Sequence, residues 1–139
     1  MLYLDTSIVV AALTNEPRSA EIHEWLERTH DPLSVSHWVL TEFAAALSIK
    51  VRMGKLTEPD RTASSRRFDL LLAETFEVMP VLAEDFRRAA TFTARHDLGL
   101  RGGDALHLAI AHAGGAELVT LDKRLAQAGE ALGVPARLL

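Results

Sequence analysis

Short apolar runs alternate along this chain with longer segments in which apolar residues recur every three or four positions. The first run, Met1–Leu4, stops abruptly at Asp5 and has the length of a buried strand. Similar runs predict strands at 33–35, 76–79, 117–122 and 134–138. Helical spacing fills the intervening segments: 8–13, 19–29, 37–53, 57–75, 83–96, 105–112 and 123–132. This alternation predicts an α/β protein, a three-layer α/β/α sandwich with a central parallel sheet of four to five strands.

Polar residues at the starts of these segments predict where several helices begin. Asp5 and its two successors are expected to cap the first helix, Ser19 the second and Ser36 the third. Asp104 is expected to open the helix at 105–112, after a tight entry that Gly102-Gly103 allows. In the helix at 83–96 the spacing predicts an apolar stripe made of Phe86, Ala89, Ala90 and Phe92.

Composition narrows the class of protein. The length of 139 residues fits one domain spanning 1–139, and 48% hydrophobic with 24% charged residues is typical of a globular chain. The absence of cysteine excludes disulfides and thiolate metal sites. No apolar run reaches the roughly 18 residues of a membrane span, and no secretory signal opens the chain, so we expect a cytoplasmic protein. The net charge of −4 does not favour nucleic-acid binding, although bound cations would neutralise part of it.

Four carboxylates stand in apolar surroundings, unlike the other acids of the chain. Asp5 and Asp122 each follow an apolar strand, and the carboxyl ends of parallel strands are where ligands bind in such sheets. Asp104 is the sole acid between Leu98 and Ala116. Glu42 is the sole ionisable group between residues 38 and 49, and its helical neighbours cannot solvate it. We therefore expect Asp5, Glu42, Asp104 and Asp122 to meet in one place.

Several carboxylates brought together need a counter-charge. A buried, unpaired carboxylate costs several kcal/mol or takes up a proton. No lysine or arginine lies on the same helical faces, whereas a hard divalent cation such as Mg²⁺ or Mn²⁺ prefers oxygen ligands. Such ions promote displacement at phosphorus, so the acids predict metal-assisted phosphodiester chemistry.

Each acid also has a plainer interpretation. Taken singly, Asp5, Asp104 and Asp122 could serve only as helix caps, and Glu42 could be a half-exposed helix residue. The prediction rests on the four together.

Neighbouring polar residues extend the candidate site. Three hydroxyls beside the acids would orient them through hydrogen bonds, although capping and strand propensity explain them equally well: Thr6, Ser7 and Thr120. Basic residues that flank the acids are candidates for RNA phosphate contacts, against the alternative of solvated charges: Arg101, Lys123 and Arg124. His107 lies one turn past Asp104, where it either touches substrate or is a satisfied core histidine.

The ordered set of motifs resembles the PIN domain family. It consists of Leu-Asp5-Thr-Ser, Glu42 in the third helix, Arg101-Gly-Gly-Asp104-Ala-Leu-His-Leu-Ala, and Leu-Val-Thr120-Leu-Asp122. The small size resembles the VapC toxin branch of type II toxin–antitoxin systems. This resemblance implies a Mg²⁺- or Mn²⁺-dependent endoribonuclease whose acidic quartet is Asp5, Glu42, Asp104 and Asp122, with Asp5 and Asp104 as direct ligands. It also implies a homodimer, an RNA substrate and a small VapB-like antitoxin whose C-terminal tail blocks the pocket.

Two other functions compete with this prediction. A phosphohydrolase of the haloacid-dehalogenase type would use an Asp nucleophile after the first strand, but it needs a second acid two residues later, where this chain has Ser7. A catalytically silent PIN-like module that binds RNA or a protein would not need the intact set of acids.

Overall fold

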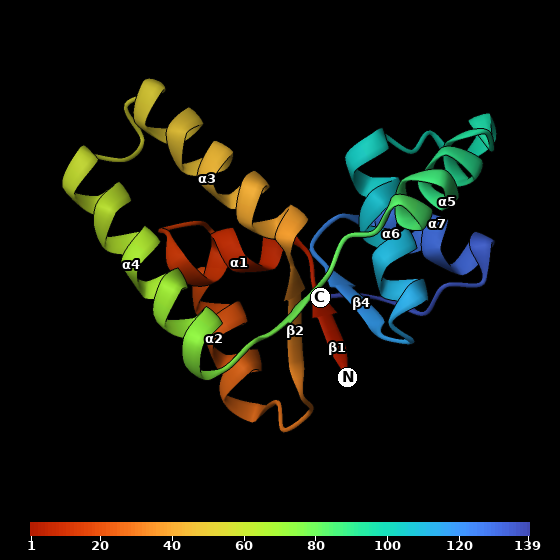
Figure 1. The fold of residues 1–139 in the computed structure, drawn as a ribbon. Coiled ribbons are helices and arrows are strands. Elements are labelled where there is room, and N and C mark those ends of the chain that lie inside the picture. Colours follow the sequence, from red (N-terminus) through yellow and green to blue (C-terminus); the bar gives the residue numbers. More distant parts are fainter.

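A fully parallel five-stranded sheet forms the centre of the computed structural model, which describes all 139 residues. Its strands are β1 (Leu2–Leu4), β2 (Leu33–Ser36), β3 (Glu77–Met79), β4 (Glu117–Thr120) and β5 (Ala136–Leu138). Their order across the sheet is β3-β2-β1-β4-β5. Figure 1 shows β1 between β2 and β4. The three inner strands are mostly buried on both faces. In β2 one face carries Ser34 and Ser36, whose buried hydroxyls form hydrogen bonds with β1.

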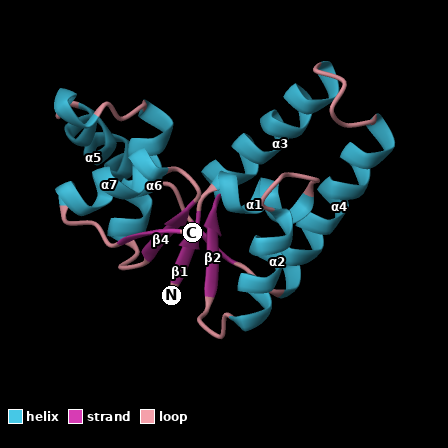
Figure 2. Ribbon diagram, turned by 180° about the vertical axis from the view of Figure 1, so that it is seen from behind, coloured by secondary structure: helices cyan, strands magenta, loops and turns pink.

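Helices cover both faces of this sheet (Figures 1 and 2). On one side lie α1 (Thr6–Leu13), α2 (Ser19–Arg28), α3 (His37–Arg52) and α4 (Glu58–Glu74). On the other lie α5 (Ala83–Thr93), α6 (Gly102–Ala113) and α7 (Lys123–Leu132), with the short 3₁₀ helix η1 (His96–Leu98) between α5 and α6. The predicted α/β/α sandwich with a parallel sheet is confirmed. None of the helices combines the length and the apolar composition that crossing a bilayer requires.

The direction in which the chain crosses the sheet reverses between β1 and β4. From β1 the chain moves outward through β2 to β3, then returns to β4 beside β1 and moves outward again to β5. The connections leaving β1 and β4 therefore diverge at their carboxyl ends. In open α/β sheets such a reversal opens a crevice that binds ligands, and Asp5 and Asp122 follow these two strands.

Helix caps set several of the boundaries. Asp5 and Ser36 are N-caps whose side chains accept backbone N–H groups of α1 and α3, as predicted. Asp122 caps α7 in the same way, as its plainer interpretation allowed. Ser19 is not a cap, because it is the first helical residue of α2 and Arg18 occupies the N-cap position. Its hydroxyl instead closes the preceding turn, accepting from the Glu16 N–H at 2.9 Å and donating to a backbone carbonyl.

The predicted apolar stripe of α5 is wrong in two of its four positions. Phe86 is 56% exposed and Ala90 is also exposed, whereas Ala89 and the carboxylate of Asp85 are buried. Asp85 accepts the Leu82 N–H at 2.7 Å and so caps the helix from inside the structure. This cap and the packing of α5 on α6 rotate the helix away from the orientation that its apolar residues alone suggest.

The start of α6 also differs from the prediction. The helix begins at Gly102, with Arg101 at the N-cap, so Asp104 lies in its first turn instead of before it. Gly102 and Gly103 have ordinary helical backbone angles, and the left-handed residue of this loop is Gly99 at φ +60°. Residues 105–111 are all buried, which makes α6 the most enclosed helix of the chain.

Candidate active site

A cleft of about 380 Å³ opens at the carboxyl ends of β1 and β4, and all four predicted acids line it. Asp5 comes from the end of β1, Glu42 from α3, Asp104 from α6 and Asp122 from the start of α7. Its remaining lining residues are Thr6, Ser7, Ala45, Ala46, Ile49 and His107. The four acids predicted to meet are therefore brought to one place, from segments as far apart as the two ends of the chain.

Asp5 lies at the bottom of the cleft with only 4% of its surface exposed. Its Oδ1 accepts the Ser7 hydroxyl at 2.5 Å and the Ile8 N–H at 3.2 Å, while Oδ2 accepts the Thr120 hydroxyl at 2.6 Å. Burial raises the pKa of Asp5 above its usual value, although these hydrogen bonds oppose the rise. The carboxylate is thus firmly oriented and costly to keep ionised.

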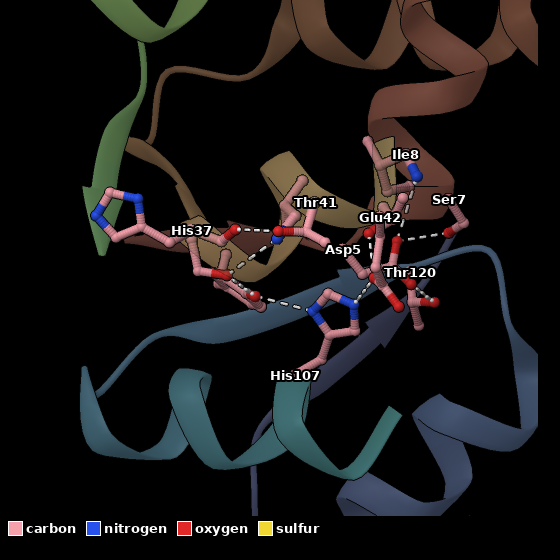
Figure 3. Close-up of polar contacts among 12 residues, drawn as sticks. Asp5, Ser7, Ile8, His37, Thr41, Glu42, His107 and Thr120 are labelled. Atoms are coloured by element: carbon pink, nitrogen blue, oxygen red, sulfur yellow. Dashed lines mark hydrogen bonds and ion pairs between the residues drawn. The ribbon is translucent and has the colours of Figure 1, made fainter. Parts of the chain in front are cut away.

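Glu42 reaches into the cleft from α3 and is held from both helix layers (Figure 3). Its Oε2 accepts the Thr6 hydroxyl at 2.5 Å and is 2.6 Å from Nε2 of His107. Burial by itself raises the pKa of Glu42, but the hydrogen bonds from His107 and from the Thr6 hydroxyl oppose this rise, and the pKa lies below its usual value. The second oxygen, Oε1, has no hydrogen-bond donor from the protein.

Asp104 and Asp122 keep oxygen atoms free. Asp104 is half-buried and accepts no hydrogen bond, and its pKa is raised by burial and then by the charge of Asp122. Asp122 uses Oδ1 to cap α7, at 2.7 and 3.2 Å from two backbone nitrogens, and leaves Oδ2 unbonded. Capping and facing the cleft are therefore compatible for Asp122, and capping does not explain Asp104.

The structure favours the satisfied-core interpretation of His107. Its side chain is 3% exposed, and both ring nitrogens have partners, because Nδ1 lies 2.8 Å from the Tyr3 hydroxyl. The sequence predicts Tyr3 only as a strand residue and Ser36, the other partner of its hydroxyl, only as a helix cap. The available signal was a phenol in a buried strand, since a buried tyrosine hydroxyl usually finds a hydrogen-bond partner.

The three predicted hydroxyls contact the acids of the cleft, whereas the three predicted basic residues lie outside its lining. Thr6, Ser7 and Thr120 all donate to a cleft carboxylate. The basic side chains are exposed and lie outside the lining of the cleft: Arg101, Lys123 and Arg124. The charge of Arg101 lowers the pKa of Asp104. A role for the three in contacting RNA stays a prediction.

The donor chemistry of the cleft fits a hard divalent cation. The available ligand atoms are carboxylate oxygens, three of the carboxylates have an oxygen without a hydrogen-bond donor, and no cysteine is present. Burial is the main cause of the raised pKa of Asp104, and the nearby charge of Asp122 adds to it; a bound cation would offset that charge. No three of the acidic or histidine side chains converge on a single ion position in this structure.

Comparison with known proteins identifies the fold family. The solved structures that resemble this one include VapC20 from Mycobacterium tuberculosis, a sarcin–ricin-loop-cleaving toxin, with a TM-score of 0.73 and 20% identity over 93% of this chain and 95% of that chain. VapBC2 from Rickettsia felis, bound to a promoter DNA fragment, has a TM-score of 0.71 and 20% identity over 100% of this chain and 99% of that chain. FitAcB from Neisseria gonorrhoeae has a TM-score of 0.72 and 16% identity over 98% of this chain and 96% of that chain. No curated protein is significantly similar in sequence. The PIN domain profile matches residues 2–131. With nearly the whole chain matched, this protein belongs to the PIN domain family.

Proposed function

We propose that this chain is a metal-dependent endoribonuclease and the toxin of a type II, VapBC-type toxin–antitoxin module. The observation that carries the proposal is the gathering of Asp5, Glu42, Asp104 and Asp122 around one cleft of a PIN domain. The similar toxin from Mycobacterium tuberculosis, described as cleaving the sarcin–ricin loop, supports RNA as the substrate class.

The four acids would hold Mg²⁺ or Mn²⁺ in this proposal. When bound, such an ion would supply Lewis-acid assistance to the hydrolysis of a phosphodiester. The chain's own residues have separate tasks. Ser7 and Thr120 orient Asp5 from two sides, and Thr6 orients Glu42. Without a cation the clustered carboxylates repel an RNA phosphate, so substrate binding is expected to depend on metal.

The proposed partners are a small VapB-like antitoxin and a second copy of the chain. The similar structure from Rickettsia felis is a VapBC2 complex, and one from Haemophilus influenzae, 20% identical with a TM-score of 0.64, is VapBC-1. Both support a toxin–antitoxin pair. The single-domain organisation over 1–139, the homodimer and a cytoplasmic location stay predictions.

RNA cleavage by the purified chain tests the proposal. We expect Mn²⁺ or Mg²⁺ to support cleavage and a chelator to stop it, and Asp5→Asn or Asp104→Asn to reduce cleavage to background. The matched control is Asp69→Asn, which changes an exposed acid of α4 outside the cleft and should cleave like the wild type. Cleavage that survives both cleft substitutions contradicts the proposed site. A chain that neither cleaves RNA nor binds Mn²⁺ in calorimetry is the catalytically silent module instead.

A further inference from the structure

A chain of hydrogen bonds runs from Glu42 in the cleft into the buried sheet. Oε2 of Glu42 lies 2.6 Å from Nε2 of His107, and Nδ1 of the same ring lies 2.8 Å from the Tyr3 hydroxyl. That hydroxyl lies 2.8 Å from Oγ of Ser36. Figure 3 shows His107 reaching from α6 toward Glu42 on α3. The chain therefore connects both helix layers and two neighbouring strands.

Water has little access to the inner part of this chain. Tyr3 and Ser36 are fully buried, and His107 is 3% exposed. A polar group at such a depth must bond to the protein or lose its hydrogen bond altogether. Each member therefore depends on the next for its orientation.

Only one arrangement of donors suits a neutral His107. A carboxylate only accepts, so Nε2–H of His107 donates to Glu42 and Nδ1 is left as an acceptor. Tyr3 then donates its hydroxyl proton to Nδ1 and accepts from the hydroxyl of Ser36. Burial raises the pKa of Tyr3, reinforced by the charges of Asp5 and Glu42, so the phenol keeps the proton that it donates. The hydroxyl of Tyr3 thereby selects the Nε2–H tautomer of the ring.

We propose that His107 and Tyr3 are positioning residues for Glu42, and that neither contacts RNA. Tyr3 orders the ring of His107, and the ring holds Oε2 of Glu42 while Oε1 stays free of protein donors. The inference rests on the proposed function of the cleft and extends it, because it assigns a role to a strand residue outside the cleft lining.

Three substitutions at position 107 separate positioning from mere packing. Glutamine places an amide N–H near the position of Nε2 and can still donate to Glu42. Asparagine reaches only the position of Nδ1, and leucine donates nothing. We expect His107→Asn and His107→Leu to lower kcat ~10- to 100-fold, as for other residues that orient ligand side chains. His107→Gln should recover most of that loss, with KM for RNA little changed in all three.

A substitution in Tyr3 and a control complete the kinetic test. Tyr3→Phe removes one oxygen atom and should lower kcat in the same direction as His107→Asn. His112→Gln changes an exposed histidine of the same helix and should leave kcat unchanged. The positioning role would be overturned if kcat fell in proportion to the loss of stability, measured as the urea unfolding midpoint, and if His107→Gln had no higher kcat than His107→Asn.

A spectroscopic readout keeps this inference separate from the proposed function. ¹⁵N NMR of the wild type should show His107 in the Nε2–H form with a slowly exchanging ring proton, and Tyr3→Phe should shift the Nδ1 signal and speed that exchange. A mixture of tautomers in the wild type would overturn the inference whether or not the protein cleaves RNA. Absence of cleavage with the expected NMR signature would remove the proposed function and leave the hydrogen-bond chain supported.

Discussion

Replacing Gly103 by alanine would push a methyl group against the carboxylate of Glu42. A Cβ built on Gly103 lies 3.1 Å from Oε1 of Glu42 and 3.4 Å from the ring of Trp38. Both distances are at or below the lower end of ordinary Cβ contacts, so the side chain of Glu42 must move by a few tenths of an ångström. Oε1 is the oxygen without a protein donor, and the substitution therefore acts on the part of Glu42 that the proposed function uses.

The size of the expected effect follows from this displacement. A misplacement of about 1 Å at a reacting centre costs roughly 100-fold in rate. If the logarithm of the rate falls in proportion to distance, a shift of about 0.3–0.5 Å costs roughly 4- to 10-fold. Stability should change little, because the gain of about 0.5–1 kcal/mol from replacing a helical glycine is offset by the crowding.

The neighbouring glycine supplies the matched control. A Cβ on Gly102 meets nothing within 4 Å, and both glycines have helical backbone angles. We expect Gly102→Ala to gain up to about 0.5–1 kcal/mol in urea unfolding and to cleave RNA at the wild-type rate. Steady-state cleavage by the two variants is the assay. Equal activity of Gly103→Ala and the wild type, or equal loss in both variants, would refute the reasoning.

Three further predictions concern the charge of the cleft and the packing below it. Burial raises the pKa of Asp5 in the folded protein, so the wild type loses stability as the pH rises from the unfolded pKa of about 4 through the folded one. In the presence of a chelator, thermal unfolding should therefore show Asp5→Asn to be more stable than the wild type at pH 7, and the difference should vanish near pH 4. Mn²⁺ at 100 times its Kd should stabilise the wild type by about 2.7 kcal/mol, and Asp104→Asn by less, so equal shifts in melting temperature would remove Asp104 from the ligand set. Gly129→Ala should cost about 1–3 kcal/mol in urea unfolding, because its Cβ would lie 2.6 Å from Cβ of Ala136 and 3.0 Å from a backbone carbonyl; an unchanged midpoint would contradict the tight packing of α7 on β5.

Periodicity predicted the elements that are long and regular, and it failed where a polar contact decides the geometry. The helix at 123–132 has the predicted bounds, since its cap and apolar spacing agree. In α5 they disagree, and the buried cap formed by Asp85 leaves Phe86 exposed. The Gly102-Gly103 pair predicts a tight entry to the helix, but in the structure Glu42, 61 residues earlier in the chain, occupies the space where a side chain of residue 103 would lie.

The sequence by itself determined the α/β class, the parallel sheet and the identity of the four unusual acids. Apolar spacing is local, and an acid inside an apolar run is conspicuous wherever it folds. Only the tertiary structure decided that the ring of His107 bonds to both Glu42 and Tyr3. The two partners of His107 are far from it in the sequence, Glu42 by 65 positions and Tyr3 by 104. Such hydrogen bonds depend on the order of the strands and on how α3 and α6 meet across the cleft, and no local sequence pattern indicates either.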